Sequence, residues 1–223
     1  GEIKPDVVVV VGDVTSTLAG ALAAKKLGIK VAHVEAGLRS FNDKMPEEYN
    51  RRETDKISDY LFVTEPQAEK NLLDEGMDLE KINHVGNVMI DTLLRFLPKI
   101  EQVQSKILSG NLKLQGKQFA ILTLHRIENL NFDIESKLQM LESVAKKITI
   151  VFPVHPHTHE RIGNERLSEM SGKGIEAISP LGYIEFITLM KNAKFVLTDS
   201  GGIQEETTVL GVPCLTLRNE TER

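Results

Sequence analysis

The sequence predicts an α/β fold with two doubly wound domains that face each other across a cleft. Strand-like and helix-like segments alternate along all 223 residues, which is typical of right-handed parallel βαβ units. Several strand-like segments are apolar on both faces, as expected inside a parallel sheet. Glycine and polar residues interrupt the alternation at 109–111 and 116–117. We therefore expect a Rossmann-like domain with a connecting helix at residues 1–110 and a second Rossmann-like domain at 111–223.

The first half begins with residues 6–11, which read DVVVVV. They are apolar on both faces, as in a central parallel strand. Pro46 predicts the start of a helix, because proline fits the first helical turn, and Pro98 predicts a break or kink in another helix. Further strands are expected at residues 31–34, 60–63 and 83–85, and helices at 14–27, 46–58, 66–75 and 88–108.

The second half repeats this scheme. Ligands of such folds bind at the carboxyl ends of the strands, and the cleft between two domains is a favoured ligand-binding site. Functional residues are therefore expected where strands end. Strands are expected at residues 119–123, 149–152, 176–178, 194–198 and 213–217, and helices near 133–147, 158–170, 183–191 and 202–210.

The composition excludes several classes of partner. The net charge is −5 and there is no basic tract, which argues against nucleic acid as a main partner. An anionic ligand must therefore be held by local charges. No run of about 18 apolar residues indicates a membrane span. Cys214 is the only cysteine, so no intrachain disulfide can form and a cytoplasmic protein is expected.

The segment at residues 195–210 is the most informative. An apolar strand leads into Ser200, and Gly201 and Gly202 stand at the bend before a helix. Helix N-termini carry unpaired N–H groups and a partial positive charge, which hold phosphate, and glycines let a diphosphate approach the backbone. Glu206, about one turn further, is placed to reach the sugar hydroxyls of a nucleotide. An ordinary βα loop with a tight Gly-Gly turn is the alternative.

Other strand ends carry groups suited to acid–base chemistry. Carboxylates come from the first half and basic groups mostly from the second. A cleft between the halves would place acid–base groups, each worth about 10²–10⁴-fold in rate, opposite a diphosphate pocket. These residues are Asp13, Glu35 and Glu47 in the first half and His125, Arg126 and His155 in the second.

The carboxylates also have structural interpretations. Asp13 would cap the helix that follows it. Glu47 and Glu48 would interact favourably with the dipole of the helix that Pro46 opens. Glu35 directly follows an apolar strand, so its carboxylate needs a partner.

The basic and aromatic candidates have alternatives as well. His125 and its neighbour would form a local ion pair with Glu128. Phe186 is by default a core residue. The alternate histidines at 155, 157 and 159 suggest zinc, but no matching cysteine or carboxylate ligand is evident, so no metal is expected.

Short motifs follow one another along the chain. They are GDVTST at 12–17, HVEAGLRS at 33–40, MPEEYNR at 45–51, HVGNVMID at 84–91, LTLHRIEN at 122–129, PVHP at 153–156, PLGYIEF at 180–186, TDSGGIQEE at 198–206 and RNETER at 218–223. As a set they closely resemble the non-hydrolysing UDP-N-acetylglucosamine 2-epimerases. The resemblance covers almost the whole chain.

This resemblance implies a fold like that of the two-domain nucleotide-sugar glycosyltransferases, the GT-B type. It also implies reversible epimerisation of UDP-GlcNAc at C2 to UDP-ManNAc, by elimination and re-addition of UDP through bound 2-acetamidoglucal. No redox cofactor is needed, and a homodimer is expected. The alternatives are a hydrolysing 2-epimerase that releases ManNAc, a GT-B glycosyltransferase, and an inactive UDP-binding fragment.

The resemblance also assigns roles to residues. Asp13, Glu35 and Glu47 match the catalytic carboxylates, His125 matches a histidine near the diphosphate, and Phe186 matches the aromatic that stacks on uracil. The expected substrate-binding residues are Arg126 and His155 at the diphosphate, Ser200, Gly201 and Gly202 at the phosphate turn, Glu206 at the ribose and Arg223 at the nucleotide.

Two segments of the family pattern have no counterpart in this chain. These are the N-terminal GTRPE segment and the segment after the final TER. We therefore expect a chain that is truncated at both ends, with an incomplete N-terminal domain. The alternative is a compact product in which a partner covers the apolar strand at residues 6–11, since such an edge is prone to aggregate.

Overall fold

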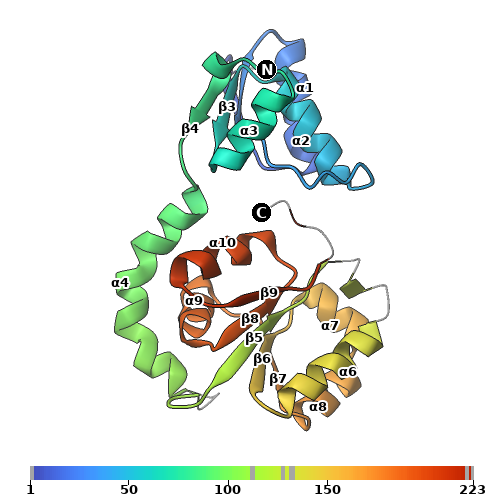
Figure 1. Ribbon diagram of the computed structural model, residues 1–223, viewed down its shortest axis with the longest axis vertical. Helices are drawn as coiled ribbons and strands as arrows, with labels where there is room; N and C mark the ends of the chain where they lie inside the picture. Colours follow the sequence, from blue (N-terminus) through green and yellow to red (C-terminus); the bar gives the residue numbers. More distant parts are fainter. Residues whose placement is uncertain (1–2, 111–113, 127–128, 131–133, 219–220, 222–223) are drawn as a thin grey trace. The chain divides into compact units, whose positions relative to one another are not determined.

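The computed structural model describes residues 3–110, 114–126, 129–130, 134–218 and 221. Their contacts form two compact units that divide between Val88 and Met89. Each unit contains a parallel β-sheet with helices between successive strands (Figure 1). The predicted α/β class is confirmed.

Unit 1 contains a four-stranded parallel sheet in the order β1-β2-β3-β4. Its strands are β1 (Val7–Val11), β2 (Lys30–Val34), β3 (Tyr60–Val63) and β4 (Ile82–His84). The connecting elements are α1 (Thr15–Lys26), α2 (Pro46–Ile57), α3 (Pro66–Asp74) and the short 3₁₀ helix η1 (Leu79–Lys81). Proline opens both α2 and α3, as its fixed φ angle favours.

The hydrophobic cores of unit 1 lie on one face of its sheet. Val10 pairs with His33, and His33 pairs with Leu61, so these three side chains point to the same side. Val10 packs with Ala21 of α1, and Leu61 packs with Ala68 of α3. The helices therefore cover this face, which is also the face that buries His33.

Among the described residues β1 is an edge strand of its sheet, so the central position predicted for residues 6–11 stays a prediction. The exposure of alternate side chains in β1 differs sharply, because Val10 is buried whereas Val9 and Val11 are 61% and 57% exposed. A central strand needs a neighbour on each side and cover on each face, and β1 has only β2 and one helical layer among the described residues.

Unit 2 contains a five-stranded parallel sheet in the order β7-β6-β5-β8-β9. Its strands are β5 (Phe119–Thr123), β6 (Thr149–Pro153), β7 (Ile175–Ile178), β8 (Phe195–Thr198) and β9 (Cys214–Thr216). Its helices include α4 (Val88–Leu108), α6 (Ile134–Ala145), α7 (Pro156–Ile162), α8 (Asn164–Ser171), α9 (Tyr183–Asn192) and α10 (Gly201–Leu210).

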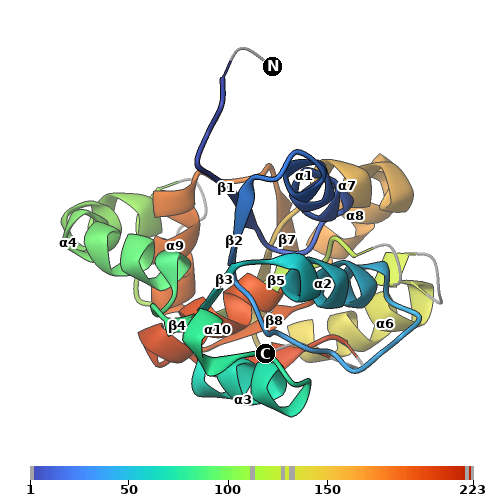
Figure 2. The same cartoon turned by 90° about the horizontal axis from the view of Figure 1, so that it is seen from above.

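The chain of unit 2 winds in both directions from β5. It proceeds outwards through β6 and β7 and then returns to place β8 on the other side of β5. One core contains Leu122 and Phe152 with Leu138 of α6. The other contains Phe119 with Ile187 of α9. Helices α4 and α9 lie on one side of the sheet and α6 to α8 on the other (Figure 2). Unit 2 is therefore doubly wound, with a topological switch point between β5 and β8.

Two helix predictions need correction. Of the break or kink predicted at Pro98, the break is wrong, because α4 continues through this residue, and the kink stays a prediction. Its side chains Leu93 and Ile100 pack in a core of unit 2, and the contacts divide the chain before this helix. The predicted domain boundary between residues 110 and 111 stays a prediction. The helix predicted at 158–170 is two helices, because Gly163 adopts a positive φ of 82° between α7 and α8.

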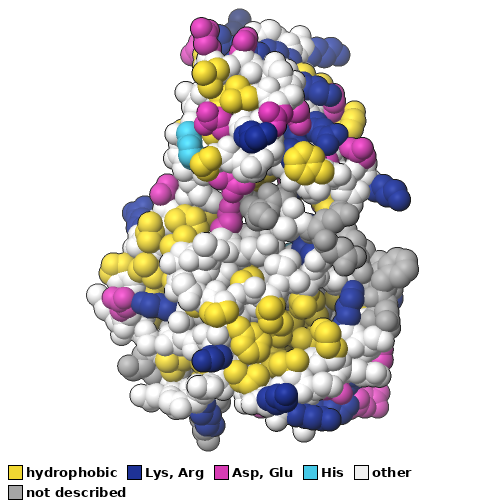
Figure 3. Space-filling model, viewed as in Figure 1, with side chains coloured by type: hydrophobic (Ala, Val, Ile, Leu, Met, Phe, Trp, Pro, Cys, Tyr) yellow, Lys and Arg dark blue, Asp and Glu magenta, His cyan; other side chains and the backbone are white. Residues whose placement is uncertain are grey.

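Some apolar surface of unit 2 is exposed. Hydrophobic side chains gather over the strands on the face seen in Figure 3, and Leu215 of β9 is 55% exposed. Within the described part of the chain, none of the helices has the length and apolar character needed to cross a bilayer.

Candidate functional site

Asp13 and Glu35 lie on adjacent turns at the carboxyl edge of the unit 1 sheet. Strands β1 and β2 end together, since Val11 pairs with Val34, and the Gly12 N–H donates to the Val34 carbonyl at 3.1 Å. A Cβ placed on Gly12 would lie 3.7 Å from Glu35 Oε2. The Glu35 carboxylate is therefore beside the residue that precedes Asp13, as the shared strand end predicts.

Glu35 has an unusual backbone conformation. Its φ angle is +67°, in the left-handed region that costs a non-glycine residue about 1–3 kcal/mol. Such strain persists where the surrounding structure fixes the backbone, and it is common at functional sites. The conformation supports a functional role for this carboxylate.

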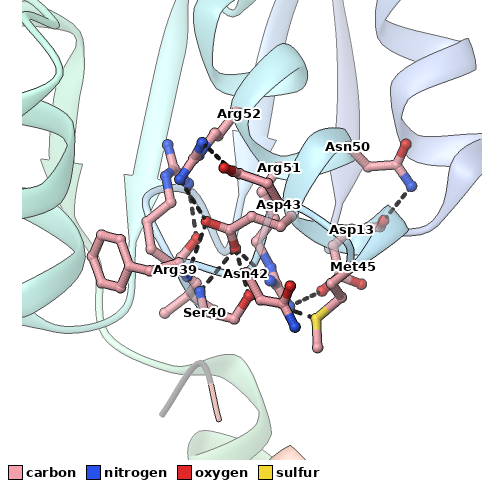
Figure 4. A network of polar contacts seen from close by, with 12 residues as sticks. Asp13, Arg39, Ser40, Asn42, Asp43, Met45, Asn50, Arg51 and Arg52 are labelled. Carbon is pink, nitrogen blue, oxygen red and sulfur yellow. Dashed lines mark hydrogen bonds and ion pairs between the residues drawn. The ribbon is translucent and has the colours of Figure 1, made fainter. Parts of the chain in front are cut away.

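Helix α2 contacts Asp13 through its side chains. Arg51 Nη2 lies 2.6 Å from Asp13 Oδ2, and Asn50 Nδ2 donates to the Asp13 carbonyl at 2.8 Å (Figure 4). Glu47 is half-buried and lies three and four residues before this pair, on the same helix face. The helix thus presents Glu47 on the side that meets Asp13, and Arg51 is a site residue that the sequence analysis missed.

Glu48 has a structural role that separates it from Glu47. Its side chain is 1% exposed and accepts hydrogen bonds from the Ser40 N–H at 2.8 Å and the Ser40 hydroxyl at 2.9 Å. It also pairs with Arg51 at 3.1 Å. Burial opposes ionisation, but the bonds from Ser40 and Arg51 outweigh it and lower the Glu48 pKa. Glu48 therefore anchors the loop before α2 and orients Arg51.

In unit 2, Asp199 organises the ends of β5 and β8. It follows β8, is fully buried and accepts from His125 Nδ1 at 2.8 Å. Backbone N–H groups of His125 and Arg126 donate to it at 3.0 and 2.9 Å, and Asn129 Nδ2 at 3.0 Å. Burial opposes the charge, but these donors outweigh it and lower the Asp199 pKa to about 2. The sequence analysis missed Asp199, although its position at a strand end was a usable signal.

The Asp199 contact fixes the orientation of His125. Since Nδ1 faces Asp199, the Nε2 edge is left for a ligand, and the side chain is 42% exposed. Arg126 Nε donates to the Asp199 carbonyl at 3.1 Å, so the Arg126 guanidinium also stabilises the turn after β8. Glu128, the alternative partner for this pair, lies outside the described residues.

His155 lies near His125. The two ring centroids are 6.2 Å apart, because β6 and β5 are neighbours in the sheet. His155 precedes α7, and its Nδ1 accepts the His157 N–H at 3.4 Å. Among the described residues, no group of three or more His, Cys, Asp or Glu side chains is arranged to hold a metal ion.

The predicted phosphate turn begins α10. Ser200 is the N-cap residue, and its side chain makes no capping hydrogen bond. Gly202 has no positive φ, and an added Cβ would meet the Met89 side chain at an ordinary 3.5 Å. Packing within the chain therefore does not require glycine at 202. The start of this helix lies at the β5–β8 switch point, where open α/β sheets bind ligands, and helix N-termini favour anions.

The rest of the predicted nucleotide site lies on α9 and α10. The Tyr183 hydroxyl donates to Glu206 Oε1 at 3.1 Å, a contact that the sequence analysis did not foresee. Burial raises the Glu206 pKa, and burial with the Glu206 charge raises the Tyr183 pKa to about 12. Phe186 is partly buried against the core. This position is compatible with a core residue and with an aromatic ring that stacks on uracil. Arg223 lies outside the described residues.

The predicted residues of each kind fall within one unit. Unit 1 holds the three carboxylates, and unit 2 holds the basic, phosphate-turn and ribose candidates. The predicted cleft between these clusters stays a prediction.

This chain is similar to known nucleotide-sugar epimerases. Residues 1–223 match the family described as UDP-N-acetylglucosamine 2-epimerase. A UDP-N-acetylglucosamine 2-epimerase of Methanococcus maripaludis is 48% identical over 227 residues, which cover 99% of this chain and 62% of that protein. A UDP-2,3-diacetamido-2,3-dideoxy-D-glucuronate 2-epimerase of Pseudomonas aeruginosa is 43% identical, over 98% of this chain and 60% of that protein.

A solved structure agrees with these relatives. The crystal structure of the Methanocaldococcus jannaschii UDP-GlcNAc 2-epimerase in complex with UDP-GlcNAc and UDP superposes with a TM-score of 0.87 at 45% identity. The match covers 100% of this chain and 62% of that chain. The chain therefore spans about three fifths of the length of the relatives it matches.

Proposed function

Because the chain belongs to the UDP-N-acetylglucosamine 2-epimerase family, we propose that the full-length protein interconverts UDP-GlcNAc and UDP-ManNAc by inverting C2 of the sugar. The observation that carries this proposal is the pair of carboxylates, Asp13 and Glu35, at neighbouring strand ends, with Arg51 bound to Asp13. Inversion at a carbon requires a proton to leave one face and return to the other, and two positioned carboxylates supply both groups.

The proposed reaction proceeds by elimination and re-addition. One carboxylate removes the C2 proton while the C1–O bond to UDP breaks, and the electron pair leaves with UDP. A C1=C2 double bond forms, which gives 2-acetamidoglucal. A second carboxylate then delivers a proton to the opposite face of C2 as a UDP oxygen re-forms the bond to C1. Atoms and electrons balance without an oxidant or reductant, so we propose no redox cofactor.

The residues of unit 2 suit the UDP group in this scheme. UDP leaves as an anion, and the α10 N-terminus at Ser200, Gly201 and Gly202 provides N–H donors for it. We assign His125 to the diphosphate on the family resemblance. We assign the ribose hydroxyls to Glu206, which Tyr183 orients. We also assign uracil stacking to Phe186 and further diphosphate contacts to Arg126 and His155, on the family resemblance. The match to the family is the support for Arg223.

Isotope exchange tests this proposal directly. Full-length protein incubated with UDP-GlcNAc in heavy water should form UDP-ManNAc, and both sugars should acquire deuterium at C2, as measured by proton NMR. The Glu35→Gln variant should lower kcat by about 10²–10⁴-fold. Glu53→Gln is the matched control, because Glu53 also lies on α2 but its side chain pairs with surface Lys56 at 2.7 Å.

Other products would contradict the proposal in distinct ways. Epimerisation with retention of the C2 proton rules out the elimination. Free ManNAc and UDP identify a hydrolysing enzyme, and transfer of the sugar to an added acceptor identifies a glycosyltransferase. Binding of UDP without turnover identifies a binding module.

We also propose that the full-length protein is a cytoplasmic homodimer. The support is the family resemblance and the single cysteine of these 223 residues, Cys214, which allows no disulfide within them, as is typical of proteins from a reducing compartment. Sedimentation of the full-length protein measures the oligomeric state, and a monomer at micromolar concentration would contradict the dimer.

A further inference from the structure

We propose that His33 and Asp55 form a positioning pair, which holds the two turns carrying Asp13 and Glu35 in the geometry that the epimerisation needs. This inference rests on the proposed function for its activity measurements. Neither residue touches the reacting atoms, because both side chains are completely buried. They act through the backbone of the turns.

His33 joins β2 to the turn before Asp13. Its Nε2 lies 2.9 Å from the Gly12 carbonyl oxygen, and its Nδ1 lies 2.6 Å from Asp55 Oδ1. A carbonyl oxygen only accepts hydrogen bonds, so Nε2 carries a proton and donates it to Gly12. The second ring nitrogen then shares a proton with the Asp55 carboxylate. The imidazole ring thus links the Gly12 carbonyl, which contacts Nε2, to Asp55 of helix α2, which contacts Nδ1.

Asp55 joins α2 to the turn after Glu35. Its Oδ2 accepts the Gly37 N–H at 3.2 Å and pairs with Arg39 Nη2 at 2.8 Å. Arg39 also pairs with Glu75 at 2.7 Å, so the titratable and charged groups that contact Asp55 are His33 and Arg39, with Glu75 beyond Arg39. One carboxylate therefore contacts both the histidine that holds the first turn and the backbone of the second.

The turn held by Asp55 has little freedom. Gly37 has a φ of +79°, and a Cβ there would lie 2.4 Å from the Ala68 carbonyl oxygen, which excludes any side chain. Glu35, two residues earlier, is itself held at a φ of +67°. A backbone in such a conformation needs surrounding contacts to maintain it. A misplacement of about 1 Å in a catalytic group costs about 10²-fold in rate, so these contacts matter to the reaction.

Two substitutions of His33 separate the two hydrogen bonds. The amide nitrogen of asparagine lies close to the place of Nδ1, so His33→Asn keeps the contact to Asp55 and loses the one to Gly12. The amide nitrogen of glutamine reaches the place of Nε2, so His33→Gln keeps the Gly12 contact. If the pair positions Asp13, His33→Asn should lower kcat by about 10- to 100-fold with KM nearly unchanged, and His33→Gln should restore much of that loss.

Asp55→Asn tests the contacts that Asp55 makes with the turn after Glu35, and Asp59→Asn is its matched control. Both aspartates pair with a cation and accept a backbone N–H in unit 1, but Asp59 contacts Lys25 at 3.0 Å and the Val31 N–H at 2.8 Å, away from both turns. Asp55→Asn should lower kcat in full-length protein. Asp59→Asn should lower the thermal midpoint while kcat stays within about twofold of wild type.

Amide hydrogen exchange provides a measurement independent of activity. In the folded protein, exchange at Gly12 should accelerate in His33→Asn, and exchange at Gly37 should accelerate in Asp55→Asn, with neither effect in Asp59→Asn. If wild type shows no deuterium at C2, the proposed function fails and this exchange measurement still judges the positioning. If both variants retain wild-type exchange and kcat at matched stability, the positioning proposal is overturned.

Discussion

Asp199 is the single residue that most clearly links stability to the candidate site of unit 2. Its carboxylate is fully buried and accepts hydrogen bonds from His125, Arg126 and Asn129. A buried charge is tolerated only when hydrogen bonds compensate for lost hydration. The same contacts therefore stabilise unit 2 and set the orientation of His125.

Substitution of Asp199 should alter stability in acid. Burial opposes its charge, but its donors lower the folded pKa from 3.8 to about 2. A folded pKa below the unfolded value stabilises the protein above the unfolded pKa, and this contribution is lost as the pH falls through the folded pKa. Asp199→Asn should therefore remove about 2 kcal/mol of pH-dependent stability. Urea unfolding should show the difference from wild type shrinking between about pH 4 and pH 2, and a constant difference would contradict the ionised state.

Tyr183 should affect nucleotide binding through Glu206. Tyr183→Phe removes the hydroxyl that donates to Glu206 Oε1 at 3.1 Å while the ring contact with Phe96 at 5.9 Å can remain. We expect UDP affinity to fall by about 2- to 10-fold, the usual worth of one hydrogen bond. Calorimetry with full-length protein measures this, with Tyr49→Phe on α2 of unit 1 as the control. Equal affinity in wild type and Tyr183→Phe would exclude the orienting role.

At the scale of elements, α10 joins a local sequence signal to the architecture of unit 2. The Gly-Gly start follows β8, and the sheet order places that strand end beside the end of β5. The helix thus starts at the switch point of the sheet, where two neighbouring connections leave in opposite directions. The Gly-Gly turn predicts an anion site from the sequence, and the sheet order adds that this turn lies at a ligand-binding edge of the sheet.

Two helical glycines allow a matched test of this element. An added Cβ would meet a side-chain atom at 3.5 Å in both, Met89 Cε at Gly202 and Val10 Cγ1 at Gly20. Alanine is favoured over glycine in helices by up to about 1 kcal/mol, so neither Gly202→Ala nor Gly20→Ala should destabilise the chain strongly. Only Gly202→Ala should weaken UDP binding, as measured by calorimetry. Unchanged UDP affinity would show that phosphate does not approach this turn.

At the scale of the whole molecule, uncovered apolar surface is the main feature. Val9 and Val11 expose more than half of their side chains on one face of an edge strand, and hydrophobic side chains gather on a face of unit 2. Edge strands and apolar patches of this kind promote association. The 223-residue chain should therefore be prone to self-association.

Threonine substitutions in β1 test this consequence. Val9→Thr with Val11→Thr keeps β-branched side chains but adds hydroxyls to the exposed face, so association should decrease with little change in unfolding free energy. Val10→Thr is the control, because Val10 is buried and a buried hydroxyl without a partner costs about 1–3 kcal/mol. Sedimentation at several protein concentrations measures association, and an unchanged profile in the double variant would contradict this account.

The sequence by itself determined the α/β class, the alternation of elements and most members of the candidate site. These follow from local signals: apolar runs that favour parallel strands, prolines that begin α2 and α3, and polar residues at strand ends. Asp13 with Glu35 and His125 with Ser200 were predictable because parallel strands bring their carboxyl ends to one edge.

Only the tertiary structure decided how these groups are held. His33 and Asp55 are 22 residues apart in sequence, and Asp199 and His125 are 74 apart, so no local pattern marks either pair. The distinct roles of Glu47 and Glu48 arise because a helix turns neighbouring side chains to different faces. The packing of α4 on unit 2 likewise depends on which distant surfaces meet, because Leu93 and Ile100 lie in a core of that unit.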